Sequence, residues 1–159
     1  MVRAVLTACV ALALAATPSR AEKPDAADSA KVQSCVKSAG AATRDRERCI
    51  GVVADPCAEN ENAQSTADQV ACAARELAVW DDILNETYRR LRDKLDAKQK
   101  IQLRDMQRAW IESRKRTCDF YWDFFQGTMA SPMSAFCENR ETARRALILL
   151  GFLDDAEGR

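Results

Sequence analysis

The feature that most constrains this chain is a long stretch, from about Thr66 to Phe124, in which apolar residues recur every three or four positions. This spacing places side chains on one face of an α-helix. The stripe runs through Val70, Ala74, Leu77, Trp80 or Asp81, Leu84, Tyr88, Leu91 and Leu95, and continues with Leu103, Met106, Trp110, Ser113, Thr117, Phe120 or Tyr121, and Phe124. Only five glycines and four prolines occur in 159 residues, which favours helices over a turn-rich β-sandwich. An all-α fold is predicted.

Two capping motifs divide the stretch. Thr66-x-x-Gln69 and Asp96-x-x-Gln99 both have the form of a capping box, in which two side chains satisfy free backbone N–H groups at a helix start. The second motif predicts a tight turn, and therefore an antiparallel hairpin of two long helices. The alternative is one unbroken helix of roughly 55 residues, which would exceed the mean helix length several-fold and expose its stripe.

A final helix follows the hairpin. Ser131 and Pro132 suit an N-cap and a first helical residue, and the apolar pattern continues to Leu150. Gly151 is a typical C-terminal stop. We expect residues 154–159 to form a frayed tail.

Residues 1–21 have the pattern of a secretory signal peptide, with Arg3, an apolar run and the small-x-small site Ser19-Arg20-Ala21. The apolar run is too short for a membrane anchor, which needs about 20 residues. Cys9 ends a sequence that resembles a lipoprotein box, but too few apolar residues precede it, and we interpret the match as coincidence. The mature protein is therefore expected to be periplasmic or secreted.

Next come a flexible leader at 22–30 and a short helical hairpin at 31–56. Gly40 separates the two short helices, and Thr43 is a candidate cap for the second, which is expected to reach about Ala54. Asp55-Pro56 is expected to end the hairpin, because the residue before proline avoids the helical region.

Six of the seven cysteines remain once the signal is removed, and an even number in an exported chain predicts three disulfides. The chain has no His and no Cys-x-x-Cys pair, so zinc spacing is absent and neither metal nor cofactor is expected. Six cysteines allow fifteen pairings. Cys35 and Cys49 are equidistant from one predicted turn, and Cys118 and Cys137 from another, which favours these two local pairs. Cys72 lies one turn into the first long helix and can reach back across the loop to Cys57, which favours Cys57–Cys72. Each of the three pairs closes a loop of roughly 15–20 residues, worth about 3 kcal/mol.

Charge and composition exclude several function classes. Lys plus Arg and Asp plus Glu number 24 each, so no field draws the chain to nucleic acid or to a membrane surface. Without His, a phosphate-binding glycine loop or a nucleophile beside a base, the sequence does not predict an enzyme. It predicts a rigid binding module.

Several motifs occur together in one order: Cys57, Cys72-Ala73, Glu76, Trp80-Asp81, Leu84-Asn85, Tyr88, Leu91, Leu103, Gln107-Arg108-Ala109-Trp110-Ile111, Arg114, Cys118, Gly127-Thr128-Met129, Pro132-Met133, Cys137, Thr142 and Arg144. As a set, these motifs resemble the LprI-type lysozyme-inhibitor domain over about Cys57 to Leu150. The family often has two glycines in its last loop, and Gln126 stands at the first of these positions.

The resemblance implies an exported helical protein whose partner is a lysozyme or another peptidoglycan hydrolase. The alternative is an envelope interaction protein without a hydrolase target. The candidate partner-binding loop is Gly127, Thr128, Met129, Ala130 and Ser131, which a plain connector would also explain.

Trp110 and Arg114 lie one helical turn apart. We interpret Trp110 as core and Arg114 as the ion-pair partner of Asp81 on the facing helix, with partner binding by Trp110 and Arg114 as the alternative.

Overall fold

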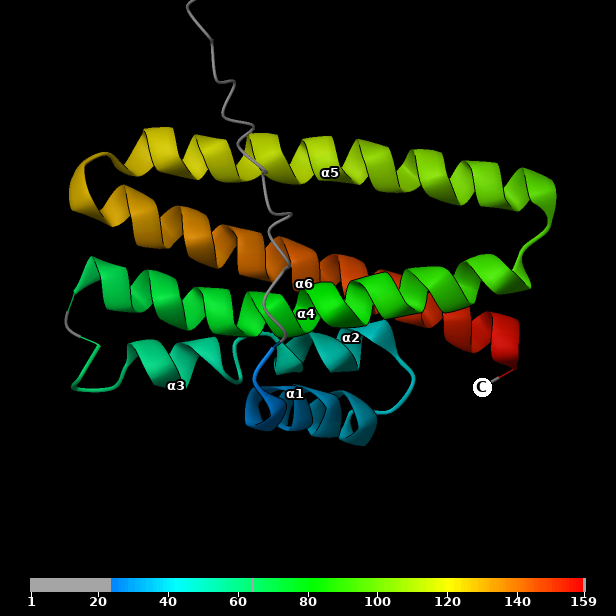
Figure 1. The fold of residues 1–159 in the computed structure, drawn as a ribbon, viewed down its shortest axis with the longest axis horizontal. Helices are drawn as coiled ribbons and strands as arrows, with labels where there is room; N and C mark the ends of the chain where they lie inside the picture. The colour runs from blue at the N-terminus through cyan, green and yellow to red at the C-terminus, as the bar shows by residue number, and fades with distance from the viewer. Residues whose placement is uncertain (1–23, 64, 159) are drawn as a thin grey trace, which may run out of the picture.

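The computed structural model describes residues 24–63 and 65–158, and all regular structure within them is helical (Figure 1). The elements are α1 (Ala26–Ser38), α2 (Thr43–Arg46), the 3₁₀ turn η1 (Glu47–Cys49), α3 (Ala54–Ala58), α4 (Thr66–Lys94), α5 (Ala97–Phe125), the 3₁₀ turn η2 (Gly127–Met129) and α6 (Ala130–Glu157). The all-α prediction is confirmed. The signal peptide and Cys9 lie outside the described residues.

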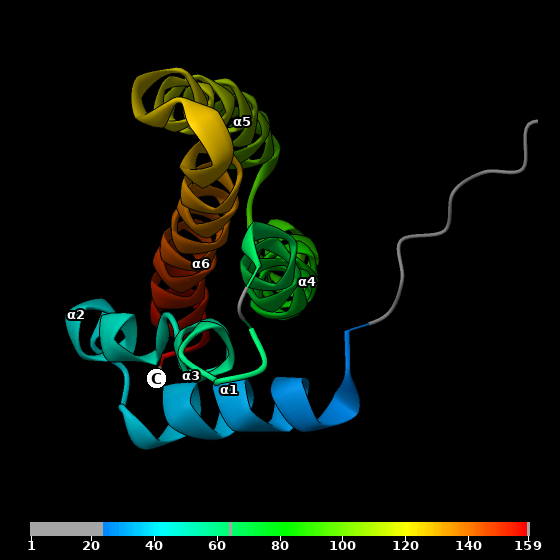
Figure 2. The same ribbon diagram turned by 90° about the vertical axis from the view of Figure 1, so that its left-hand side faces the viewer.

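The long helices α4 and α5 form the predicted hairpin, but α6 is the helix on which both pack. Figure 2, which looks along these helices, shows α6 between α5 and the short N-terminal helices, with α4 beside it. α6 contacts α4 and α5 extensively, whereas α4 and α5 rarely approach each other. α6 is therefore apolar on several sides, with Ala143, Ala146, Leu147, Leu149 and Leu153 all buried.

This arrangement changes which residues face the core. In α4, Trp80, Leu84 and Leu91 are buried as expected, but Ala74 is exposed and the buried face passes instead through Ala73 and Glu76. Helix α5 has one helix as its main neighbour, so its predicted stripe is buried only in part. Beyond Trp110 the predicted inward residues Ser113, Thr117, Phe120 and Phe124 are exposed.

The helix starts agree with the sequence at one position and differ at others. Asp96 and Gln99 form the predicted capping box of α5. The capping box of α4 lies one residue earlier than predicted, between Ser65 and Asp68. In this box Ser65 Oγ accepts from the Asp68 N–H, and the Asp68 carboxylate accepts from the Ser65 N–H.

The C-terminal predictions were wrong in three respects. Helix α6 begins at Ala130, so Ser131 is not its cap, and it continues through Gly151 to Glu157. At Gly151 a Cβ would lie 3.0 Å from Thr43 Oγ1, so this glycine lets α2 approach α6 closely. The expected frayed tail is helical and anchored: buried Asp154 pairs with Arg46 at 2.8 Å, and Glu157 pairs with Arg90 at 3.0 Å.

The N-terminal segment also differs from the prediction. Asp25 caps α1, which begins at Ala26, so most of the expected leader is helical. The expected second helix is divided among α2, η1 and α3. Pro56 lies in the first turn of α3 and does not end a helix, because its missing N–H is not needed there.

No helix of the described part combines the length and the apolar character needed to cross a bilayer.

Candidate functional site

Three disulfides connect neighbouring elements, with the pairings expected from the sequence. Cys35–Cys49 joins α1 to η1, Cys57–Cys72 joins α3 to α4, and Cys118–Cys137 joins α5 to α6, with Cα–Cα distances of 5.7, 5.5 and 5.5 Å. Each bridge fixes one chain reversal. The third holds the end of the molecule where α5 turns into α6.

The turn between α5 and α6 is tighter than the predicted loop. Gly127, Thr128 and Met129 form the exposed 3₁₀ turn η2, while Ala130 is buried and Ser131 half-buried in the first turn of α6. The chain enters the turn with positive φ at Gln126 (42°) and Gly127 (64°), a region that favours glycine. Ser134 Oγ donates to the Cys118 carbonyl at 3.1 Å beside the disulfide, which ties the two helices together.

Large apolar side chains crowd this end of α5 without cover. Together with the η2 turn they form what we call the aromatic tip: Phe120, Tyr121, Trp122, Phe124, Phe125, Gly127, Thr128 and Met129. Phe124 is 66% exposed, Phe120 63% and Trp122 53%. The rings contact one another, with centroids 5.7 Å apart for Phe120 and Phe124 and 5.3 Å for Phe124 and Phe125.

A shallow cleft of about 230 Å³ opens between Phe120, Tyr121, Phe124 and Phe125. Exposed apolar side chains that gather in this way are candidates for an interaction surface. Sequence periodicity assigned Phe120 and Phe124 to the core. Periodicity identifies an apolar face of a helix, but it does not show whether another element covers that face.

The predicted pairing of Arg114 with Asp81 was wrong. Asp81 is exposed and accepts a hydrogen bond from Asn85 Nδ2 at 2.9 Å. Arg114 Nη1 donates to Thr142 Oγ1 on α6 at 2.8 Å, and its guanidinium lies 4.9 Å from the Trp110 ring centroid. The reason is the position of α6, which lies where α4 was expected. Trp110 is half-buried and packs against the core.

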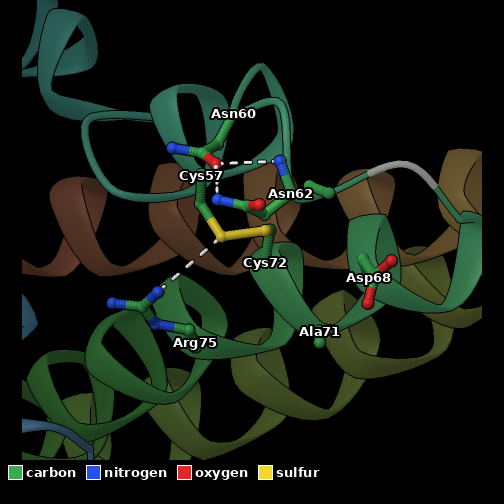
Figure 3. A pocket seen from close by; sticks show the side chains of 8 residues that line it. Cys57, Asn60, Asn62, Asp68, Ala71, Cys72 and Arg75 are labelled. Atoms are coloured by element: carbon green, nitrogen blue, oxygen red, sulfur yellow. Dashed lines mark hydrogen bonds between the residues drawn. A yellow bond between two sulfur atoms is a disulfide. The ribbon is translucent and has the colours of Figure 1, made fainter.

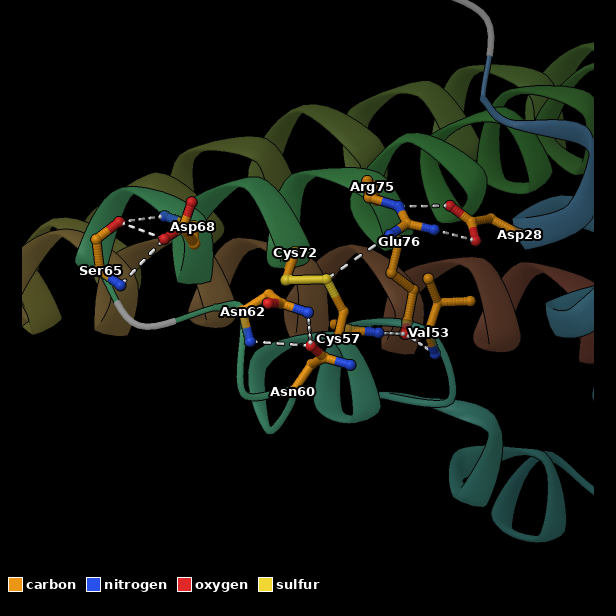
Figure 4. Close-up of a disulfide and its surroundings, with 11 residues drawn as sticks. Asp28, Val53, Cys57, Asn60, Asn62, Ser65, Asp68, Cys72, Arg75 and Glu76 are labelled. Atoms are coloured by element: carbon orange, nitrogen blue, oxygen red, sulfur yellow. Dashed lines mark hydrogen bonds and ion pairs between the residues drawn. A yellow bond between two sulfur atoms is a disulfide. The ribbon is translucent and has the colours of Figure 1, made fainter.

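The buried acid of α4 is Glu76, which sequence analysis included in the family motif without assigning it a role. It is fully buried, and its carboxylate accepts from the N–H groups of Val53 at 2.7 Å and Ala54 at 2.8 Å (Figure 4). The Gly51 N–H (2.7 Å) and Trp80 Nε1 (2.9 Å) also donate to it, as does Asn139 Nδ2 from α6. The signal was available, because Glu76 lies one turn before Trp80 on the same face.

A second hollow of about 360 Å³ lies beside the Cys57–Cys72 disulfide (Figure 3). Its charged groups are already paired. Arg75 binds Asp28 of α1 at 2.8 Å, which raises the pKa of Arg75. The hydrogen bond from Ser65 lowers the pKa of Asp68. We assign this hollow a structural role, because its lining contains no nucleophile with a base.

In the part of the chain that the structure describes, no three His, Cys, Asp or Glu side chains gather as ligands for a metal ion. All six cysteines there are in disulfides.

A comparison with protein-family models identifies the family of this chain. Residues 57–149, more than half of the chain, match the family model described as lysozyme inhibitor LprI. Neither the curated proteins nor the solved structures yielded a match. The match begins at Cys57 and includes Glu76 but not the backbone donors at 51–54 that bind it. The chain belongs to the LprI family of lysozyme inhibitors.

Proposed function

We propose that this protein is an exported inhibitor that binds a lysozyme-type cell-wall hydrolase through the aromatic tip. Membership of the LprI family supports the class of partner. We choose the aromatic tip as the binding surface because Phe120, Trp122 and Phe124 are exposed beside a turn that a disulfide fixes.

The tip has the physical properties of a binding hot spot. Aromatic side chains contribute much of the energy of protein interfaces, because they bury a large apolar area and lose little conformational entropy. The Cys118–Cys137 bridge holds the tip in place before binding, so less ordering cost falls on association. The tip therefore has the features of a preformed plug.

Inhibition by such a plug requires no chemistry on the part of the inhibitor. Most glycosidases cut with two carboxylates that flank the scissile bond within a cleft. Insertion of the narrow η2 turn, Gly127–Met129, would exclude the saccharide from that cleft, while the surrounding rings contact the cleft walls. Loss of substrate access then accounts for inhibition.

The disulfides also agree with an exported protein. Bridges of this kind persist in oxidising compartments such as the periplasm or the exterior of the cell. A cell-wall hydrolase works in the same compartments. The predicted signal peptide at residues 1–21 is consistent with this location.

The test is a turbidity assay in which oxidised mature protein is mixed with several lysozyme types and a suspension of cell walls. We expect slower clearing by wild type, and a loss of inhibition of at least about tenfold in Phe124→Ser. The matched control is Phe152→Ser, which removes a comparably exposed ring (49%) from α6, remote from the tip.

Three results would contradict this proposal. Absence of inhibition at excess protein across all lysozyme types would exclude the hydrolase target, and recovery of a non-hydrolase partner from the periplasm would favour an envelope interaction protein. Equal losses in the two serine variants would exclude the tip as the binding surface.

A further inference from the structure

Two arginines on facing helices contact the same tryptophan at the seam between α5 and α6. The Arg114 guanidinium carbon lies 4.9 Å from the Trp110 ring centroid, and that of Arg145 lies 5.8 Å from it. Thr142, which accepts from Arg114, lies one turn before Arg145 on α6. The two cations therefore share one aromatic ring as a neighbour.

Neither cation has an acidic partner within residues 24–63 and 65–158. Among the residues that the structure describes, no carboxylate forms an ion pair with Arg114 or Arg145. Arg145 is only 7% exposed. Its Nε donates to Gln107 Oε1, while its Nη2 is buried without a hydrogen-bond partner in the described structure. Burial lowers the pKa of Arg145, because the charged form is poorly solvated there.

The same protein treats its other buried arginine differently. Arg46, with 8% exposure, is paired with the Asp154 carboxylate at 2.8 Å. A buried cation without a counter-charge costs folding free energy. An arginine kept in that state is therefore a candidate for a charge whose partner arrives from outside.

The seam is accessible beside Arg114. Both Arg114 and Trp110 are half-buried, so each of them reaches solvent, whereas Arg145 is buried. The surrounding backbone lies in the interiors of α5 and α6, where N–H groups are used within the helices. The site therefore offers guanidinium edges, which match a planar carboxylate, and lacks the cluster of free backbone N–H groups that tetrahedral phosphate prefers.

We propose that Arg114, Arg145 and Trp110 form a binding site for a single carboxylate. The carboxylate binds the solvent-accessible edge of Arg114, and its negative charge also offsets the charge of Arg145, which is buried nearby. It comes either from a small free molecule or from an acidic side chain of a bound protein. This site is separate from the aromatic tip and does not depend on the target proposed for the tip.

The test is an NMR titration of the oxidised protein with sodium acetate, with sodium chloride at equal ionic strength as the reference. We expect the Trp110 indole signal, identified by its loss in Trp110→Phe, to shift saturably with acetate alone. Arg114→Gln should weaken acetate binding about tenfold or more. The matched control Arg116→Gln, which changes an exposed arginine on the same helix, should leave it within about twofold.

A second arm distinguishes the two sources of the carboxylate. A short Glu-rich peptide that binds more than about tenfold tighter than acetate, and loses this advantage in Arg114→Gln, assigns the site to a protein side chain. Equal affinities assign it to a small free carboxylate. Absence of a saturable shift with both probes, or equal losses in Arg114→Gln and Arg116→Gln, overturns the proposal. Arg145→Gln should also weaken acetate binding. Arg145→Lys, which keeps the charge but not the planar fork, provides a second variant should Arg145→Gln fail to fold.

Discussion

Glu76 provides the sharpest test of how the short N-terminal helices are held to the family domain. Its two carboxylate oxygens accept five hydrogen bonds: Oε2 from the N–H groups of Val53 and Ala54, and Oε1 from the Gly51 N–H, Trp80 Nε1 and Asn139 Nδ2. In Glu76→Gln an amide NH₂ replaces one oxygen. Whichever way the amide turns, it faces at least two donors and cannot accept from them.

The magnitude follows from that geometry. A hydrogen bond to a charged group contributes about 1.5–3 kcal/mol, and a buried donor left unpaired adds its own desolvation cost. Because Glu76 is fully buried, water cannot replace the lost acceptor. We therefore expect Glu76→Gln to lower the free energy of unfolding by about 3–5 kcal/mol.

The assay is urea denaturation of the oxidised protein, followed by far-ultraviolet circular dichroism. Glu86→Gln is the control, since exposed Glu86 on the same helix pairs only with Arg89 and should cost less than about 0.5 kcal/mol. Hydrogen exchange adds a local readout, because the amides of Gly51, Val53 and Ala54 should lose protection in Glu76→Gln before the amides of α6. A loss no larger than that of Glu86→Gln would refute the reasoning.

Three further predictions address the turn, a titrating group and a disulfide. Gln126→Gly should raise the free energy of unfolding by about 1 kcal/mol, since φ is 42° at Gln126, and an unchanged urea midpoint would contradict this. Burial, followed by the Glu76 charge, raises the pKa of Asp55, so the ionised form is disfavoured in the folded state. Above its folded pKa the Asp55 charge therefore destabilises the fold, and Asp55→Asn should be more stable than wild type at pH 7. That advantage should shrink as the pH falls to about 3, where the carboxyl is protonated in both states, and pH-dependent urea titrations measure it. Replacing both Cys118 and Cys137 by Ala should cost about 3 kcal/mol in thermal or urea unfolding, and tip-dependent inhibition should weaken with it.

The local features of the fold were predictable because they depend on near neighbours in the chain. The capping box at Asp96 and Gln99 requires only four consecutive residues, and it marked the turn of the hairpin correctly. The three disulfides join cysteines placed symmetrically about turns, so short loops favoured these pairs.

The errors share a physical cause, which is competition between surfaces distant in sequence. Periodicity identified an apolar face on α4 but did not show which helix packs against that face. Glu76 was therefore given no structural role, and Ala74 was assigned to the core. Glycine is typical of helix C-termini, yet Gly151 lies within α6, where it allows a close approach to Thr43.

By itself, the sequence determined that this chain forms long helices, where the central hairpin turns, and that six of its seven cysteines lie outside the predicted signal peptide. These properties arise from backbone hydrogen bonding and side-chain spacing within a few turns. Only the tertiary structure decided that α6 lies against both α4 and α5. That placement gives Arg114 the partner Thr142 instead of Asp81 and leaves the rings of the aromatic tip uncovered. The physical reason is that burial depends on which distant surfaces exclude water together, and a pattern along one helix does not contain that information.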